Sequence, residues 1–332
     1  RAVEKFGVGM GGPPLLNGTH VLHRQLEEQL AEIKRAEDSL LFSSGFQANV
    51  GWCTALLRSR DVVLYDELSH ASLFDGIRLT KTTEKIKAYR FRHNDIEDLE
   101  RLLKSFGDPE GGIVYVVTEG VFSMEGDLGA LDKIAQLKSR YKFVFVVDDA
   151  HGTGVLGPQG QGTSEHFGVS GSVDLHLGTF SKSFGVTGGF IAGSKSLVNF
   201  LRFFSRTYLF SAHLPQTLVA SVLAGLETLK TKPEVLYSLN KNRELMSQGL
   251  RSLGLPYASP SAIFPIPVPE TVDIRALAKR IEEKGIFTNT IEYPAVPISS
   301  QRIRASVMAS HEEGHIDTFM SVLESVKREF RF

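Results

Sequence analysis

Cysteine is almost absent from this chain of 332 residues, because Cys53 is its only thiol. A single cysteine excludes any internal disulfide and fits a reducing compartment, so we expect a cytoplasmic protein. An excess of either charge is also lacking, since 37 Lys and Arg residues balance 38 Asp and Glu residues to a net charge of -1. Balanced charge gives no reason to expect binding to nucleic acid or to a membrane surface, and small-molecule work is the better prediction.

Long apolar runs are missing as well. No stretch reaches the roughly 18 residues of a membrane span, and no signal-peptide pattern opens the chain, so we expect no integral membrane segment. What the chain does have is enough length and a 42% share of hydrophobic residues for a large core and two domains. A change of composition at 230–234 predicts a large domain at 1–234 and a smaller C-terminal α/β domain at 235–332.

Apolar strand-like runs alternate with amphipathic helical stretches, a pattern typical of an α/β sheet with functional loops at its strand ends. In the large domain the pattern predicts helices at 23–33 and 48–57, and strands at 62–65, 113–117, 143–147, 175–177 and 189–192. In the smaller domain it predicts helices at 235–253, 273–284 and 312–329, and extended segments at 262–268, 285–289 and 303–308.

One lysine, Lys182, stands on a small-residue turn directly after the strand predicted at 175–177. An amine held there can form a Schiff base if its pKa is lowered enough. The strand at 143–147 ends at Asp148, which could keep a ring nitrogen protonated through a charge-assisted hydrogen bond of roughly 1.5–3 kcal/mol. Either residue alone fits a solvated lysine or a strand-end cap equally well. Because parallel strands end at one edge of a sheet, we expect the two together, and the pair predicts pyridoxal phosphate (PLP).

Four segments in chain order resemble the motifs of the α-oxoamine synthases: SHAS at 69–72, EGVFSMEGD at 119–127, DDAHG at 148–152 and TFSK at 179–182. These fold-type I PLP enzymes condense an amino acid with an acyl-CoA and lose carbon dioxide. The resemblance implies an α/β large domain with a central, mostly parallel seven-stranded sheet, and a homodimer with PLP as cofactor. It also implies that the family's N-terminal segment is lacking, because Arg1 already falls inside the large domain.

The resemblance assigns the residues around the cofactor ring one by one. Lys182 would carry PLP and act as general base, and Asp148 would bind the ring nitrogen. His70 would stack on the pyridine ring, although an isolated histidine beside a helix start is usually a structural cap. His151 and Ser123 match residues that bond to the phenolic oxygen or lie near the substrate, with a satisfied polar loop residue as the alternative. No metal is implied.

The resemblance also assigns groups around the cofactor phosphate. The turn before the helix at 48–57 offers backbone N–H groups that suit a phosphate, although such a turn is more often a plain helix start. In the family the matching positions, Gly45 and Phe46, contact the phosphate, and Thr179 matches another phosphate ligand. Ser211 falls in a segment that reaches into the neighbouring subunit's site, where Ala212 replaces the family's usual second hydroxyl.

Arg304 is the candidate that would bind the substrate carboxylate. Strand alternation places Arg302 and Arg304 on one face, where both could simply be solvated. A guanidinium binds a carboxylate through two parallel hydrogen bonds, which also fixes the geometry at the α-carbon. Family position gives this role to Arg304.

The motifs do not single out one substrate pair. Segments at 16–19, 42–49, 92–94, 162–168 and 178–183 look most like bacterial serine palmitoyltransferase, and 184–189 resembles 8-amino-7-oxononanoate synthase, which uses alanine and a pimeloyl thioester. Segments at 77–79 and 293–294 are shared with the glycine-using aminoketobutyrate ligase branch. The acyl carrier could be CoA or a carrier protein.

Two departures and two alternatives accompany the resemblance. Pro13 and Pro14 stand where many relatives have Ser-Arg, which could reshape the acyl-CoA entrance. Glu292 replaces an arginine, and an acid there would repel a substrate carboxylate.

An aminotransferase of the same fold would need the same lysine, acid and arginine, and a regulatory partner without catalysis is the non-enzymatic alternative. Retention of Lys182 argues against the latter.

Overall fold

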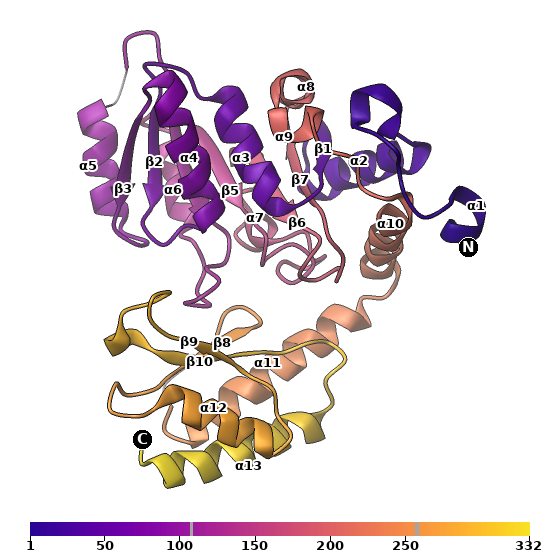
Figure 1. Cartoon of the computed structure of the whole chain (residues 1–332). Coiled ribbons are helices and arrows are strands. Elements are labelled where there is room, and N and C mark those ends of the chain that lie inside the picture. The colour runs from indigo at the N-terminus through magenta and orange to yellow at the C-terminus, as the bar shows by residue number, and fades with distance from the viewer. Residues whose placement is uncertain (107–108, 256–258) are drawn as a thin grey trace. The chain divides into compact units, whose positions relative to one another are not determined.

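The computed structural model describes residues 1–106, 109–255 and 259–332, and the chain divides into two compact units (Figure 1). The N-terminal unit consists of Arg1–Val121 and Leu128–Thr231, and the C-terminal unit of Phe122–Asp127 and Lys232–Phe332. The sequence pattern placed a boundary between 234 and 235, and it gave no sign that a short segment from the middle of the chain groups with the C-terminal unit.

A seven-stranded sheet forms the centre of the N-terminal unit, with strand order β1-β7-β6-β5-β4-β2-β3. The strands are β1 (Asp38–Phe42), β2 (Val62–Asp66), β3 (Lys87–Phe91), β4 (Val114–Glu119), β5 (Val144–Asp148), β6 (Leu175–Thr179) and β7 (Gly189–Gly193). Neighbours pair in parallel, except that β7 runs antiparallel to both β1 and β6. The predicted mostly parallel seven-stranded sheet is confirmed.

Helices cover both faces of this sheet, because successive strand side chains point to opposite faces and both sets are apolar. One face packs against α3 (Gly45–Leu56), α4 (Ala71–Glu84), α8 (Lys195–Phe204) and α9 (Arg206–Leu209). The other packs against α2 (Val21–Lys34), α5 (Ile96–Phe106), α6 (Leu131–Leu137) and α10 (Gln216–Thr231). Shorter elements complete the unit: α1 (Ala2–Phe6), α7 (Thr163–His166), a π-helical turn at Pro14–Gly18 and a 3-10 turn at Ser170–Ser172. Burying one large apolar side chain in such a layer stabilises the fold by roughly 1.5–3 kcal/mol.

All strands except β7 run in the same direction, so their carboxyl ends lie at one edge of the sheet. Asp148 pairs with Glu119 on one side and with Leu177 on the other, so β4, β5 and β6 end side by side. Phe42 and Thr179 both pair with Gly189 of β7, so β1 ends at the same edge. The loops that follow these strands carry most of the predicted site residues.

The C-terminal unit contains a three-stranded antiparallel sheet in the order β8-β10-β9. Its elements are β8 (Ile263–Pro267), β9 (Asn289–Ile291), β10 (Arg302–Ser306), α11 (Glu234–Ser252), α12 (Ile274–Glu283), α13 (Glu313–Phe330) and a 3-10 turn at Ile298–Ser300. Along β10 the buried Ile303 and Ala305 alternate with Arg302 and Arg304, as predicted. No helix within the described ranges combines the length and the apolar character that crossing a membrane requires.

Two predicted elements differ from the structure by three or more residues at one end. Helix α3 begins at Gly45 rather than at 48, because Ser44 caps it by accepting the backbone N–H of Gln47 at 3.1 Å. The strand predicted at 285–289 forms only from Asn289 onward. Gly285, with φ at 86°, still belongs to the end of α12, and its N–H donates to the Glu282 carbonyl at 2.8 Å.

Candidate active site

The carboxyl edge of the seven-stranded sheet holds most of the predicted site residues. They are Gly45, Phe46, His70, Asp148, His151, Thr179, Lys182 and Ser211, all of which belong to the N-terminal unit. Ser123 and Arg304 belong to the C-terminal unit.

Asp148, the last residue of β5, is held by two donors. Asn49 Nδ2 donates to Asp148 Oδ2 at 2.7 Å, and the Ala150 backbone N–H donates to Oδ1 at 3.2 Å. The residue keeps some exposed surface, yet burial of its carboxyl raises the pKa, while the Asn49 hydrogen bond opposes that shift. Each carboxylate oxygen retains lone-pair capacity for a further donor.

A directed hydrogen-bond chain joins Asp148 to His70. Trp52 Nε1–H donates to Asn49 Oδ1 at 3.2 Å, so the two amide protons of Asn49 must point away from the indole. One goes to Asp148, and the other goes to Ser72 Oγ at 3.0 Å. Ser72 Oγ then lies 2.7 Å from His70 Nδ1 and has its own proton to donate there. The chain therefore runs from helix α3 to the histidine that starts helix α4.

The position of the His70 proton follows from this chain. His70 is the N-cap of α4, and its Nδ1 also accepts the backbone N–H of Ser72 at 3.2 Å. Since Nδ1 accepts, the neutral imidazole carries its proton on Nε2. His70 is thus both the structural cap that the sequence left open as an alternative and a ring held in a fixed orientation. Asn49 and Ser72 were missed, although an asparagine inside an apolar helix was a visible signal.

The start of α3 forms an anion cradle beside the end of β6. Because the first N–H groups of a helix have no partner inside it, Gly45 and Phe46 present donors at this point. A Cβ on Gly45 would stand 3.0 Å from Thr179 Cβ, and a Cβ on Gly189 would stand 2.6 Å from the Gly45 nitrogen. The helix start therefore lies close against the sheet, and only glycine at 189 allows that approach.

Hydroxyl groups line the other side of this cradle. Thr179 Oγ1 donates to the Gly188 carbonyl at 2.8 Å and accepts the Ser181 backbone N–H at 3.3 Å. Ser181 Oγ lies 2.9 Å from Thr179 Oγ1 and is exposed. Because the Thr179 proton goes to the Gly188 carbonyl, Ser181 is the donor in this pair, and its exposed hydroxyl can rotate to donate to an anion instead. Ser181 was not among the predicted site residues.

Lys182 lies on the exposed turn between β6 and β7. The turn is closed by the Gly185 N–H, which donates to the Lys182 carbonyl at 3.2 Å, and by the fully buried Phe180 at its base. Ser183 Oγ donates to the Thr153 carbonyl at 2.7 Å. This bond ties the lysine turn to the loop that follows Asp148 and carries His151.

Asp149, the second acid of its motif, has a structural partner. It forms a buried ion pair with Lys34 of α2, with Nζ 2.8 Å from Oδ2 and both side chains essentially unexposed. Asp149 Oδ1 also accepts the Thr163 hydroxyl at 2.7 Å, and Lys34 Nζ donates to Thr153 Oγ1 at 2.8 Å. These bonds fix the loop on which His151 stands. They leave Asp148 as the acid at the strand end that is available to a ligand.

Ser211 lies against the first turn of α3 in its own chain. Gln47 Nε2 is 3.4 Å from Ser211 Oγ, and Ser43 Oγ donates to the Ala212 carbonyl at 2.9 Å. The assignment of Ser211 to the site of a neighbouring subunit stays a prediction from the resemblance.

In the C-terminal unit, the two arginines of β10 have different partners. Arg302 lies 3.6 Å from a carboxylate oxygen of Glu125 and donates to the Met124 carbonyl at 3.1 Å. Arg304 Nε donates to the Ser123 carbonyl at 2.7 Å, and no carboxylate of the described ranges lies within ion-pair distance of Arg304. Burial lowers the pKa of Arg304. Arg304 therefore keeps donors for an anion, whereas Arg302 is already paired with an acid.

Glu292, the departure that was expected to repel a substrate carboxylate, has a cationic partner. Both of its carboxylate oxygens accept from Arg275 Nε, at 2.9 and 3.0 Å. The Arg275 side chain is largely exposed, so the pair contributes little stability. The positive charge of Arg275 does offset the negative charge that Glu292 places where relatives have an arginine.

The groups at the sheet edge suit PLP. The cofactor needs a lysine for its aldehyde, an acid for its ring nitrogen and donors for its phosphate. The described residues supply Lys182, an Asp148 carboxylate with spare acceptor capacity, and a helix start that a Cβ at Gly45 or Gly189 would crowd. Site and fold together define the class as a PLP-binding α/β enzyme.

Comparisons with known proteins agree. Residues 5–323 match the family described as aminotransferase class I and II. The chain is similar to 8-amino-7-oxononanoate synthase 1 of Bacillus velezensis, at 39% identity over 332 residues that cover 100% of this chain and 83% of that one. It is similar at 39% identity over 331 residues to serine palmitoyltransferase of Bacteriovorax stolpii, covering 99% of this chain and 78% of that one. Among solved structures, serine palmitoyltransferase of Sphingomonas wittichii matches with a TM-score of 0.92 at 34% identity, covering 99% of this chain and 82% of that chain.

The chain belongs to the aminotransferase class I and II family. Its relatives place it with the α-oxoamine synthases, which confirms the predicted fold type and the predicted class, a PLP-dependent C-acyltransferase.

Proposed function

We propose that this enzyme condenses a small L-amino acid with an acyl-CoA and releases carbon dioxide, CoA and an α-amino ketone. The form that we favour joins serine to a long-chain acyl-CoA, as in serine palmitoyltransferase. The observation that supports a catalytic site most directly is the chain from Trp52 through Asn49, which presents the Asp148 carboxylate and orients His70.

Each residue has a defined task in this proposal. When bound, PLP supplies an aldehyde that captures the amino acid and a protonated ring that draws electrons from the α-carbon. Asp148 holds the proton at the ring nitrogen, and His70 packs against the ring face. Lys182 takes the proton from the α-carbon and later returns a proton to it. Arg304 binds the substrate carboxylate with the donors that Ser123 leaves available.

Other residues bind the phosphate and the phenolic oxygen of the cofactor in this proposal. The N–H groups of Gly45 and Phe46 hold the phosphate. The hydroxyls of Ser181 and of Thr179, the predicted phosphate ligand, turn from their present acceptors to donate to it. His151 and Ser123 stand near the phenolic oxygen or the substrate. Ser211 contributes its hydroxyl to the phosphate site of a neighbouring subunit.

The second candidate is the 8-amino-7-oxononanoate synthase reaction, with alanine and a pimeloyl thioester. It is favoured by the segment at 184–189 and by the 39% identity to the Bacillus velezensis enzyme of that name. A glycine-using ligase is a further form of the same chemistry. The acyl carrier in any of these is CoA or an acyl carrier protein.

We also propose that the enzyme works as a cytoplasmic homodimer, as the family resemblance implies. Exposed aromatic side chains on the N-terminal unit support a partner surface, among them Phe203 at 53%, Phe204 at 55% and Phe210 at 75% exposed. Size-exclusion chromatography with light scattering should give the mass of two chains. A monomer at micromolar concentration would contradict the dimer.

The activity is tested by thiol release from the PLP-loaded protein, with serine, alanine and glycine each combined with short, pimeloyl and palmitoyl thioesters. Thiol release with one pair confirms the class and names the substrates. Serine with palmitoyl-CoA is the expected pair, and alanine with the pimeloyl thioester would favour the second candidate. If no pair releases thiol and the protein instead transfers an amino group to a keto acid, the proposal is wrong and the protein is an aminotransferase.

A further inference from the structure

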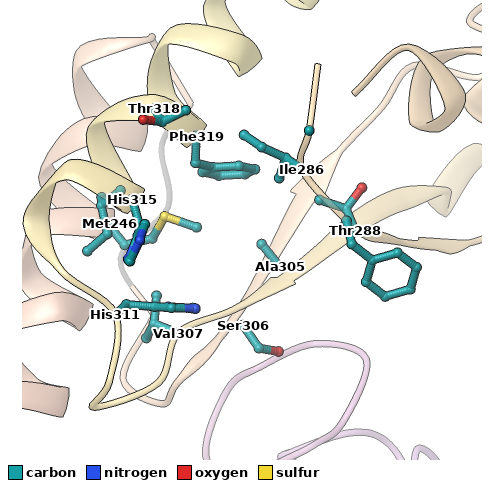
Figure 2. A pocket seen from close by; sticks show the side chains of 13 residues that line it. Met246, Ile286, Thr288, Ala305, Ser306, Val307, His311, His315, Thr318 and Phe319 are labelled. Atoms are coloured by element: carbon teal, nitrogen blue, oxygen red, sulfur yellow. The ribbon is translucent and has the colours of Figure 1, made fainter. Parts of the chain in front are cut away.

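The C-terminal unit contains a cavity of about 430 Å³ between helix α13 and strand β10 (Figure 2). Small-molecule sites in proteins fall in the range of about 300–1,000 Å³. Every residue that lines this cavity belongs to the C-terminal unit, and none of them is assigned a step in the reaction proposed above. Ser306 does touch an assigned residue, because its hydroxyl accepts from Arg304 Nη1 at 3.4 Å. The cavity therefore needs an explanation of its own.

Apolar side chains form the floor of the cavity. Met246 of α11, Val307 after β10 and Phe319 of α13 are all buried there. At the rim, Phe287 is 78% exposed, which is a large apolar surface to leave in water. No Asp, Glu, Lys or Arg is among the described lining residues, so a charged ligand group would find no counter-ion there. These features favour an uncharged ligand with a hydrocarbon part.

Two imidazoles lie among the polar residues that line the cavity, which also include Thr288, Ser306 and Thr318. His311 Nδ1 accepts the Met308 backbone N–H at 3.2 Å, and His315 Nδ1 accepts the Glu312 backbone N–H at 3.1 Å. Because both Nδ1 atoms accept, each neutral ring carries its proton on Nε2 and can donate it. The ring centroids are 6.1 Å apart. Burial, followed by the neighbouring His315, lowers the pKa of His311, which favours the neutral form of that ring.

The turn that carries His311 is fixed from the opposite side. The buried Asn242 of α11 donates through Nδ2 to the Met308 carbonyl at 2.9 Å and to the His311 carbonyl at 2.7 Å. Figure 2 shows the His311 ring extending from this turn toward strand β10. The imidazole donor is thus held in place before any ligand arrives, which lowers the entropy cost of binding.

We propose that this cavity binds an uncharged acyl compound, an apolar chain that ends in an amide or thioester carbonyl. The chain lies on the floor formed by Met246, Val307 and Phe319, and the carbonyl oxygen accepts Nε2–H of His311 and His315.

The test uses octanamide as the probe, with the full-length PLP-loaded protein, EDTA in the buffer and isothermal titration calorimetry at pH 8. Octanamide should bind saturably, and octanoate, which has the same chain and a charge, should bind at least about tenfold more weakly. His311→Asn and His315→Asn keep an acceptor near the Nδ1 position and remove the Nε2 donor. Each should weaken octanamide binding roughly three- to tenfold, the value of one hydrogen bond. His166→Asn, an exposed imidazole of the N-terminal unit, is the matched control and should change nothing.

A second measurement does not depend on the variants. In protein with ¹⁵N-labelled histidine, octanamide should shift the Nε2 resonances of His311 and His315 and leave the visible spectrum of bound PLP unchanged. The proposal is overturned by any of three results: no saturable binding, equal binding of octanoate and octanamide, or full affinity in both Asn variants. Histidine shifts confined to His70 or His151 would also overturn it, because they would assign the binding to the catalytic site.

Discussion

Asn49 Nδ2 donates a hydrogen bond of 2.7 Å to Asp148 Oδ2, and the amide can do so in only one orientation. Its oxygen accepts Trp52 Nε1–H, and its second proton goes to Ser72 Oγ. Both amide protons and the amide oxygen of Asn49 are thereby used, and two of its three partners, Trp52 and Ser72, are fully buried. An amide of helix α3 therefore determines how the acid at the end of β5 is presented.

Replacing Asn49 by Ala should weaken PLP binding by roughly tenfold or more. The variant loses a hydrogen bond to a carboxylate, worth about 1.5–3 kcal/mol, and it leaves Trp52 Nε1–H buried without an acceptor. Without that donor the pKa of Asp148, already raised by burial, should rise further. Titration of the apo-protein with PLP measures the effect. Thr54→Ala, on the same helix, removes a hydroxyl that bonds only to helix carbonyls and should bind PLP normally. Equal affinity for Asn49→Ala and Thr54→Ala would remove Asn49 from the site.

Lys34→Met should cost about 3–5 kcal/mol of unfolding free energy, because it leaves the Asp149 carboxylate buried without its cation. Asp149→Asn removes the charge while keeping an acceptor for the Thr163 hydroxyl. The double variant should therefore lose less unfolding free energy than the two single variants lose together, by more than about 1 kcal/mol. Urea unfolding at pH 7.5 measures all three proteins. Additive losses would mean that the two side chains do not stabilise each other.

His176 should make the fold sensitive to acid. Burial lowers its pKa from 6.5 to about 3, with the nearby Lys34 as the second cause. Between those pH values the unfolded chain binds a proton at His176 that the folded chain does not bind. The contribution of the neutral His176 to the unfolding free energy is therefore complete above pH 6.5 and is lost as the pH falls toward 3. The expected slope is about 1.4 kcal/mol per pH unit.

His176→Met should remove that contribution. Between about pH 4.5 and 6, its unfolding free energy should fall less steeply than that of the wild type, by about 1.4 kcal/mol per unit. The comparison at pH 8 isolates the packing effect of the methionine from the titration. His213, whose pKa burial also lowers to about 3, remains in both proteins and keeps part of the acid sensitivity. Parallel pH profiles would show that His176 is protonated in the folded state well above pH 3.

Lys182→Ala should abolish covalent capture of PLP. After borohydride reduction of the wild type, the cofactor should be found on the peptide that contains Lys182, and on no peptide of the variant. Because Lys182 lies on an exposed turn, the unfolding free energy should change by less than about 0.5 kcal/mol. Lys195→Ala, another exposed lysine, is the control and should retain the label. A reduced adduct that persists in Lys182→Ala would assign the lysine role elsewhere.

The sheet was predictable to the extent that its strands are apolar. β4 and β5 are buried in the sheet and appear in the sequence as continuous hydrophobic runs, and both were predicted within two residues of their ends. β3 (Lys87–Phe91) was missed, because this edge strand exposes Lys87 and Arg90 and has no apolar run. Charged residues on an edge strand prevent unwanted pairing, and the same residues hide the strand from a hydrophobic pattern.

The site was predictable where the type of a residue and its position at a strand end indicate its role. Lys182 and Asp148 stand at strand ends, and family motifs supplied the rest. Asn49 was missed because its partner Asp148 lies 99 positions away, and no local pattern encodes that contact. Arg302 and Arg304 looked equivalent in the sequence, since the bonds that distinguish them span 178 and 181 positions.

The C-terminal unit is built from two separate segments of the chain, which has a consequence for synthesis on the ribosome. The unit includes Phe122–Asp127, whose carbonyls accept from Arg302, Arg304 and Ser261. A polypeptide that began at Lys232 would lack these acceptors, so no single cut separates two self-sufficient pieces. During translation, a segment made in the first half of the chain must therefore stay accessible until the last hundred or so residues emerge to bind it.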